Sequence, residues 1–239
     1  METTTTKGKL YLIPTTLGNN EPLEVLPISI KQTIESVNHY IVENEKTARH
    51  FIKKINPRKS QQSLEINLLN KFTEAHEIPS FLDPCLNGIN VGILSEAGCP
   101  GIADPGADVV KIAHEKNIQV VPLVGPSSIL LALMASGFNG QNFAFNGYLP
   151  IDSSDKKKII KTLEKKSREL KQSQIFIETP YRNDKMLQEL TKTLADNSYI
   201  CVACDITLPT EFIATKKVSD WKKTKVDLHK RPTIFIIQA

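Results

Sequence analysis

Residues 91–110, with the sequence VGILSEAGCPGIADPGADVV, constrain the fold of this chain more than any other segment. The segment opens with an apolar, largely β-branched run, which is typical of a strand buried on both faces of a parallel sheet. A turn rich in small residues, 95–101, follows, and residues 104–106 lead into a helical pattern. Open α/β sheets bind ligands where a strand ends in such a loop. The segment therefore predicts a ligand-binding loop, with a plain tight turn as the alternative.

The rest of the chain predicts an α/β protein of two domains. In residues 1–122 strand patterns alternate with helical ones, which favours a parallel, doubly wound sheet. In residues 123–239 a helix through Ser136, an amphipathic helix over 155–171 and a helix to about Ala195 alternate with short strands near 143–145 and 175–177. The late strands at 199–206, 212–218 and 233–238 then follow one another without a long helix between them. We therefore expect an N-terminal α/β domain over 1–122 and a C-terminal α/β domain with a mixed sheet over 123–239.

Composition narrows the class of protein without naming a function. The net charge of +4 on 239 residues neither requires nor excludes an anionic partner. The longest apolar run, 129–135, is too short to cross a bilayer, and residues 1–9 lack the apolar core of a signal peptide. We expect a cytoplasmic protein without membrane contact. Cys201 and Cys204 form a CxxC within a predicted strand, and no second ligand pair completes a metal site, so we expect no metal and buried structural cysteines.

Four segments of the chain resemble the tetrapyrrole methylase superfamily of S-adenosylmethionine-dependent methyltransferases. They are LYLIPTTLGN at 10–19, SEAGCPGIADPG at 95–106, VVPLVGPSSILLALMASGF at 120–138, and FAFNGYLP with FIETPYR at 143–150 and 176–182. The branch most similar to this chain methylates a ribose 2′-hydroxyl of small-subunit ribosomal RNA. The resemblance implies two α/β domains, S-adenosylmethionine in the cleft between them, and a homodimer.

The resemblance also assigns residues to the cofactor. The loop after the first strand would form one wall of the cleft, and the turn of the opening segment would lie beside the methionine part. A helix N-terminus would offer hydroxyls and amides to a carboxylate, and the short strand near residue 145 would supply a wall for adenine. The expected cofactor-binding residues are Pro14, Ser95, Glu96, Ala97, Gly98, Ile102, Ala103, Asp104, Ser127, Ser128, Phe145, Gly147, Tyr148, Leu149 and Pro232.

The segments that would meet the methyl acceptor depart from the ribosomal branch. Residues 70–73 and 204–208 replace two of its signatures, and Tyr181 stands where its Glu-Ser-Pro-His-Arg segment has histidine. The small C-terminal extension of that branch is also expected to be missing. No constellation singles out a general base, although Asp104 and Glu178 are candidates and Arg182 could act as an orienting cation, so the catalytic residues stay unassigned.

RNA is the acceptor that we expect. Residues 155–171 form an amphipathic helix with a basic outer face, and a second basic cluster lies at 216–231. Both clusters would bind phosphates, and a merely solvated face is the alternative reading. A small-molecule acceptor such as a tetrapyrrole, and a non-catalytic protein that binds S-adenosylmethionine, are the alternative functions.

Overall fold

The chain folds into two units that divide between Ser127 and Ser128. The computed structural model describes residues 6–239, so part of the loose tail expected over 1–9 lies outside the described residues. The sequence predicts a boundary after residue 122, where the last strand of the first sheet ends. In the structure the loop that follows this strand, residues 123–127, packs with the first unit and belongs to it.

The first unit is built on a parallel sheet with the strand order β3-β2-β4-β1-β5. Its strands are β1 (Lys9–Ile13), β2 (His39–Val42), β3 (Glu65–Leu68), β4 (Val91–Leu94) and β5 (Gln119–Pro122). Every neighbouring pair in this sheet is parallel. β4, the strand of the opening segment, lies at the centre and is buried along its whole length. The parallel, doubly wound sheet predicted from the alternation of strands and helices is confirmed.

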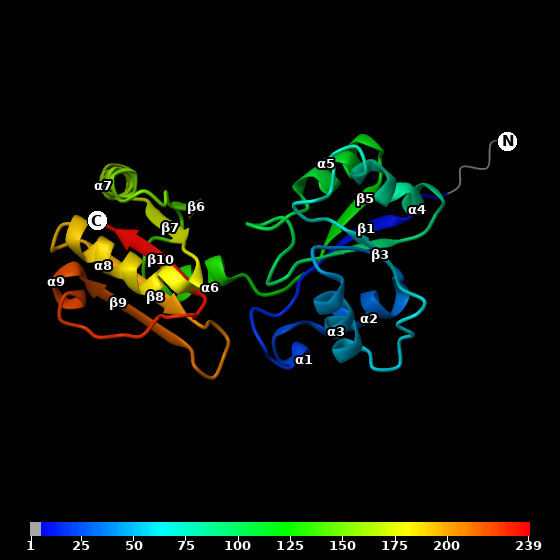
Figure 1. Ribbon diagram of the computed structural model, residues 1–239, viewed down its shortest axis with the longest axis horizontal. Coiled ribbons are helices and arrows are strands. Elements are labelled where there is room, and N and C mark those ends of the chain that lie inside the picture. The colour runs from blue at the N-terminus through cyan, green and yellow to red at the C-terminus, as the bar shows by residue number, and fades with distance from the viewer. Residues whose placement is uncertain (1–5) are drawn as a thin grey trace. The chain divides into compact units, whose positions relative to one another are not determined.

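Helices cover both faces of this sheet (Figure 1). They are α1 (Pro22–Val25), α2 (Ile28–Ser36), α3 (Glu45–Ile55), the 3₁₀ helix η1 (Ile78–Leu82), α4 (Asp83–Leu86) and α5 (Ala107–Glu115). One apolar cluster joins α2 and α3 to the sheet, and a second joins η1, α4 and α5 to it. Gly92 of β4 lets the first cluster pack, because a Cβ there would lie 2.7 Å from the Ile13 Cδ1 and 3.2 Å from the Tyr40 ring.

The second unit is built on a mixed sheet with the strand order β6-β7-β10-β8-β9. Its strands are β6 (Phe143–Tyr148), β7 (Ser173–Ile177), β8 (Tyr199–Cys204), β9 (Phe212–Lys217) and β10 (Thr233–Gln238). β6 and β7 are parallel, and the other neighbouring pairs are antiparallel. The mixed sheet expected from the late strands is therefore confirmed, and β10 is its middle strand.

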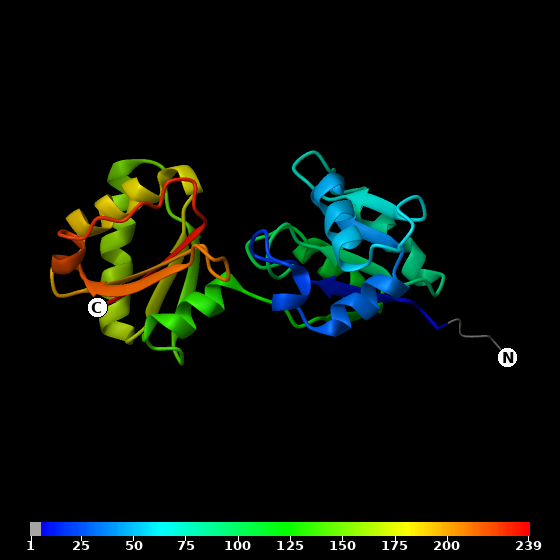
Figure 2. The same cartoon turned by 90° about the horizontal axis from the view of Figure 1, so that it is seen from below.

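The helices of the second unit are α6 (Ser128–Ser136), α7 (Ser153–Leu170), η2 (Pro180–Arg182), α8 (Asn183–Thr193) and α9 (Val218–Trp221). The long helix α7 lies along one face of the sheet (Figure 2). Its apolar residues Ile160 and Leu163 belong to the core, together with residues of α8 and the sheet. Asp152 caps α7 by accepting hydrogen bonds from the Ser154 and Asp155 N–H groups, which fixes where the helix begins.

The cysteines of the predicted strand are structural. Cys201 and Cys204 are both free thiols, fully buried on β8, as expected. Over residues 6–239 no three His, Cys, Asp or Glu side chains gather closely enough to hold a metal ion. Within the same range, no helix combines the length and the apolar character needed to cross a membrane.

Candidate functional site

The loops that follow β1 and β4 are joined at one carbonyl group. The Ser95 hydroxyl donates a hydrogen bond of 2.5 Å to the Gly98 carbonyl oxygen, and the Thr15 N–H donates to the same oxygen at 2.9 Å. The Thr15 and Ser95 hydroxyl oxygens lie 3.3 Å apart, within hydrogen-bonding distance. Both side chains are buried. Because β1 and β4 are parallel neighbours, their loops leave the sheet at the same edge, and these hydrogen bonds hold the two loops together.

The loop after β5 closes against the other two. Gly98 has a φ of 76°, and a Cβ at this position would lie 3.1 Å from the Leu17 Cδ2 and 3.2 Å from the Pro126 carbonyl oxygen. A Cβ at Gly125 would lie 2.2 Å from Cγ of Pro14. Gly98 and Gly125 therefore let the three loops pack closely, because any side chain at these two positions would collide with the neighbouring loop.

Two acidic side chains of this loop contact residues that follow β2. Glu96 accepts a 2.7 Å hydrogen bond from the Thr47 hydroxyl. Asp104 is partly buried beside Glu43 and shares a hydrogen bond with it. Burial, the charges of Glu43 and Glu96, and that hydrogen bond raise the pKa of Asp104 to about 6, against the opposing effect of the Glu96 N–H. Asp104 is thus partly protonated near neutral pH.

A hollow of about 150 Å³ opens beside these loops, within the first unit. Its lining combines hydroxyl, carboxylate, imidazole and ammonium groups, including Thr15, Ser95, Glu96, Thr47, His50 and Lys54. Thr15, Glu43 and Thr47 did not figure among the predicted site residues. Thr15 and Glu43 lie just after β1 and β2, and Thr47 lies in the first turn of α3. Their closeness to the β4 loop depends on the strand order, which puts β4 between β1 and β2.

The first unit brings together most of the predicted cofactor residues. Pro14 and the segment 95–98 meet at the junction of loops described above, and Ser127 follows the Gly125-Pro126 loop at the end of the unit. Ile102 and Ala103 are exposed, and Ala103 has a φ of 57°. The remaining predicted residues, Ser128, Phe145, Gly147, Tyr148, Leu149 and Pro232, belong to the second unit.

Those second-unit residues lie mostly at one edge of the mixed sheet. Tyr148 pairs with Ile177 of β7, and Ile177 pairs with Ile234 of β10, two residues after Pro232. Tyr148 is 60% exposed, whereas the Leu149 side chain is buried in the core. Only the backbone of Leu149 is therefore available to contact a ligand. Ser128 is the first residue of α6.

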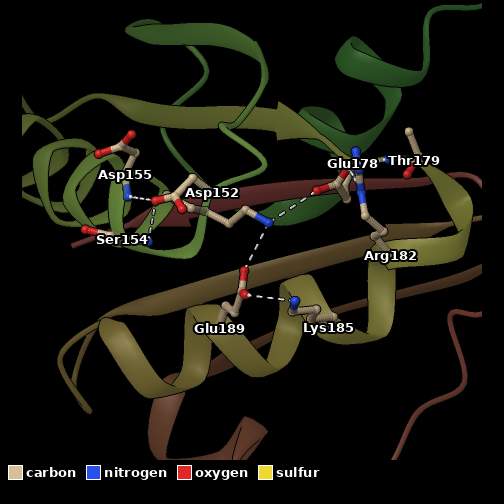
Figure 3. A network of polar contacts seen from close by, with 9 residues as sticks. Asp152, Ser154, Asp155, Glu178, Thr179, Arg182, Lys185 and Glu189 are labelled. Carbon is tan, nitrogen blue, oxygen red and sulfur yellow. Dashed lines mark hydrogen bonds and ion pairs between the residues drawn. The ribbon is translucent and has the colours of Figure 1, made fainter.

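A network of charged side chains contacts the segment 178–182. Glu178 is buried, and its Oε1 accepts hydrogen bonds from Arg182 at 2.6 and 3.0 Å and from the Thr179 N–H at 2.8 Å. Nζ of Lys156 lies 3.6 Å from Oε2 of Glu178 and 3.1 Å from Oε2 of Glu189. In Figure 3 the Glu178 carboxylate, directly after β7, and the Glu189 carboxylate of α8 both face one ammonium group, that of Lys156. Lys156 is 4% exposed, so this lysine of α7 is not part of the basic outer face that the sequence predicted.

Burial alone would raise the pKa of Glu178. The Thr179 N–H, the hydrogen bonds and charge of Arg182, and the charge of Lys156 outweigh it, and they hold this pKa below its ordinary value. Glu178 therefore stays ionised and engaged with its two cations, which makes it a support for Arg182 and removes it as a candidate general base.

The two units together define a class of protein: α/β enzymes with a parallel N-terminal sheet, a mixed C-terminal sheet and glycine-containing loops at the strand ends. The family model of the tetrapyrrole (corrin/porphyrin) methylases matches residues 9–221. The chain belongs to this family, and it is an S-adenosylmethionine-dependent methyltransferase.

Individual proteins agree with this placement. Ribosomal RNA small subunit methyltransferase I of Buchnera aphidicola subsp. Schizaphis graminum is 29% identical over 233 residues, which cover 96% of this chain and 78% of the relative. The crystal structure of the methyltransferase CobJ superposes with a TM-score of 0.64 at 14% identity, over 97% of this chain and 94% of that one. A uroporphyrin-III C-methyl transferase from Thermus thermophilus, complexed with S-adenosyl homocysteine, reaches 0.56 at 15% identity and covers 97% of both chains. These structures share the fold.

The raised pKa of Asp104 predicts a pH-dependent stability. Its pKa lies near 6 in the folded chain and about 3.9 in the unfolded chain, so the folded state holds the extra proton between these values. The free energy of unfolding should then fall as pH rises from about 4 to about 6. Asp104→Asn, which mimics the protonated form, is expected to stabilise the protein by about 1–2 kcal/mol near pH 7.5, after allowance for partial solvent access, and by much less near pH 4.5.

Urea unfolding of the two proteins at both pH values measures this difference. Glu43→Gln keeps Asp104 but removes a neighbouring charge, and we expect it to act in the same direction with a smaller effect. A gain from Asp104→Asn that is equal at the two pH values would contradict the prediction.

Proposed function

We propose that this enzyme methylates a ribose 2′-hydroxyl of small-subunit ribosomal RNA, and so works in the cytoplasm. The relative that aligns over 96% of the chain carries the name of a methyltransferase for this RNA. The exposed lysines of α7 supply a surface that suits a polyanion. Lys157, Lys161 and Lys165 are all exposed on this helix, and Lys157 also lines a hollow of about 170 Å³ with Lys192, Ser153 and Thr193.

The residues at the strand ends fit the cofactor. Gly98 and Gly125 let the three loops pack closely, because a side chain at either position would collide with Leu17, with Pro14 or with the Pro126 carbonyl. The hollow beside these loops is lined by Ser95 and Glu96 of the predicted set. We propose that the cofactor-binding residues are those expected from the resemblance, with Pro14, Ser95–Gly98, Ile102–Asp104 and Ser127 supplied by the first unit and the other predicted residues by the second. S-adenosylmethionine supplies an electrophilic methyl group on a sulfonium centre.

The protein's own task is to hold the acceptor hydroxyl in line with that methyl group. Correct positioning of two reactants is worth an effective molarity on the order of 10⁵–10⁸ M. Asp104 is the carboxyl group whose pKa lies near the pH of the cell, and it lies within the predicted cofactor loop. Glu178 is held ionised by Arg182 and Lys156 and is a positioning group. No general base is assigned.

Cofactor binding is tested with S-adenosylhomocysteine, which should raise the melting temperature because it binds the native state only. Gly98→Val is expected to abolish this shift, since its side chain meets Leu17 and the Pro126 carbonyl. Gly101→Val is the matched control: Gly101 has an almost identical φ of 75°, but no atom lies within 4 Å of its Cβ position. It carries the same backbone strain without the clash, so it should lose less stability than Gly98→Val and keep the shift. A wild-type protein that ignores millimolar ligand would refute the assignment.

The acceptor is tested by offering labelled S-adenosylmethionine together with small ribosomal subunits or their RNA. Label in the RNA is expected, at a ribose 2′-oxygen. The triple variant Lys157→Glu, Lys161→Glu and Lys165→Glu should weaken RNA binding and flatten its salt dependence, by about 0.7 log units per log of salt for each phosphate that the variant no longer binds. Its response to S-adenosylhomocysteine should stay unchanged.

Reversal of three exposed lysines of the first unit, Lys9, Lys53 and Lys111, changes the net charge equally and controls for it. Equal RNA affinity in the two triple variants would leave the basic face of α7 as a solvated surface. Label that enters a tetrapyrrole and not RNA would replace the proposed acceptor.

We also propose a homodimer, in which α6 contributes to the interface between copies. This helix is almost wholly apolar, yet Leu130 is 50% exposed and Met134, one turn later, is 78% exposed. Light scattering should give twice the chain mass of 26.7 kDa. Met134→Glu is expected to lower this mass, and Leu23→Glu, at a similarly exposed leucine of α1, is not. A monomer mass for the wild type would end the proposal.

A further inference from the structure

An exposed aromatic cluster with cations lies on the second unit. Tyr181 in η2 is 70% exposed. The His229 ring meets it at a centroid distance of 6.0 Å and an interplanar angle of 77°, and Nζ of Lys230 lies 5.7 Å from the centroid of the Tyr181 ring. Arg182 is the next residue, with 35% of its side chain exposed. A tyrosine ring open to solvent thus lies beside two groups that can carry positive charge, His229 and Lys230, and a third, Arg182, follows it in the chain.

The backbone on both sides of this cluster is anchored. The Lys230 N–H donates to the Pro180 carbonyl at 3.0 Å, and Asn183 Nδ2 donates to the Arg231 carbonyl at 2.7 Å. These bonds tie the segment before β10 to the turn after β7. Lys230 itself has a φ of 61°, which residues other than glycine rarely adopt. The cluster is therefore pre-organised.

Two ion pairs add to this anchoring. Arg231 donates to Asp205 Oδ2 at 2.8 Å, which connects the cluster to the end of β8. On the other side, Glu178 holds Arg182 in place and is itself held by Lys156 (Figure 3). Groups that are held before a ligand arrives lose less conformational entropy on binding it.

The cluster lies at the edge of the sheet where the predicted cofactor residues of this unit are found. Tyr148, Ile177 and Ile234 are in register across β6, β7 and β10. Tyr181 follows Ile177 by four residues, and Lys230 precedes Ile234 by four, so both leave the sheet at the edge that also holds Tyr148 and Pro232. A ligand on this cluster would lie beside the expected cofactor surface of the same unit.

We propose that Tyr181 is a stacking platform for an unpaired base of the RNA acceptor, with Lys230 and Arg182 binding the phosphates beside that base. This inference rests on the proposed function and identifies where the acceptor strand is held. Recognition of single-stranded RNA combines an aromatic ring, on which a base stacks, with cations that follow the backbone. The cluster presents both, whereas the lysines of α7 offer only charge.

Binding of a fluorescein-labelled single-stranded RNA of about ten nucleotides, without any methyl donor, tests the platform by fluorescence anisotropy. Tyr181→Ala should weaken binding by about 5- to 160-fold, the range that loss of one base–aromatic stack covers. Tyr181→Phe keeps the ring and should bind within about twofold of the wild type. Lys230→Ala should lower the salt slope by about 0.7, as expected for one phosphate.

Tyr199 provides the matched control. It is also a partly exposed tyrosine, 40% exposed, with a lysine, Lys217, 5.9 Å from its ring centroid. It pairs with Gln238 and therefore lies at the opposite edge of the same sheet. Tyr199→Ala should leave RNA affinity unchanged.

Three results would overturn the proposal: a wild type that does not bind the RNA, a Tyr181→Ala variant that binds it as well as the wild type, and equal losses from Tyr181→Ala and Tyr199→Ala. Titration with S-adenosylhomocysteine adds a fourth, because a loss of that affinity in Tyr181→Ala would assign the ring to the cofactor. Methyl transfer to RNA is a separate readout. If it succeeds while Tyr181→Ala binds normally, the proposed function stands and the platform fails.

Discussion

The Gly98 carbonyl is the point on which the first unit's candidate site depends. It accepts hydrogen bonds from the Ser95 side chain within its own loop and from the Thr15 backbone of the neighbouring loop. A single acceptor with two lone pairs thereby fixes both the shape of one loop and its distance from the next. The arrangement works only because β4 lies beside β1 in a parallel sheet, which brings the ends of these two strands to one edge. The strand order thus brings the two loops together, and their hydrogen bonds then set the geometry of the site.

The second unit uses buried charge for a comparable purpose. Taking Lys156 and Glu178 out of water is costly, and a buried ion pair is often no more stabilising than apolar residues of the same size. The role of the pair is to orient other groups. Glu178 accepts hydrogen bonds from Arg182 and from the Thr179 N–H, and these bonds fix the turn that carries Tyr181. Glu189, from a different helix, completes the set of charges around Lys156. The buried charges thus fix the turn at residues 179–182 before any ligand binds, at the cost of removing them from water.

The sequence predicts what is local and misses what depends on strand order. Periodicity and residue type predict the parallel first sheet, the mixed second sheet and the buried cysteines of β8. Burial of one or both faces of a strand determines which positions are apolar, so it can be read from the sequence. The contacts of Thr47 with Glu96 and of Glu43 with Asp104 cannot be read from the pattern, because the partners are 49 and 61 residues apart and β2 becomes the neighbour of β4 only in the folded sheet. Lys156 shows the same limit. Its place in a run of lysines indicates a solvated face, and only the pair of carboxylates brought by β7 and α8 explains its burial.

The position of β10 carries a consequence for the order in which the chain acquires its structure during synthesis. Residues 233–238 form the middle strand of the second sheet, between β7 and β8. Until these residues have left the ribosome, β6 and β7 cannot be joined to β8 and β9, and the apolar faces of both strand pairs have no common core. The first unit draws all its strands from residues 9–122 and can close while the rest is still being made. Folding on the ribosome is therefore expected to be sequential. The N-terminal unit folds first, and the C-terminal unit forms later in a single step, once β10 is available.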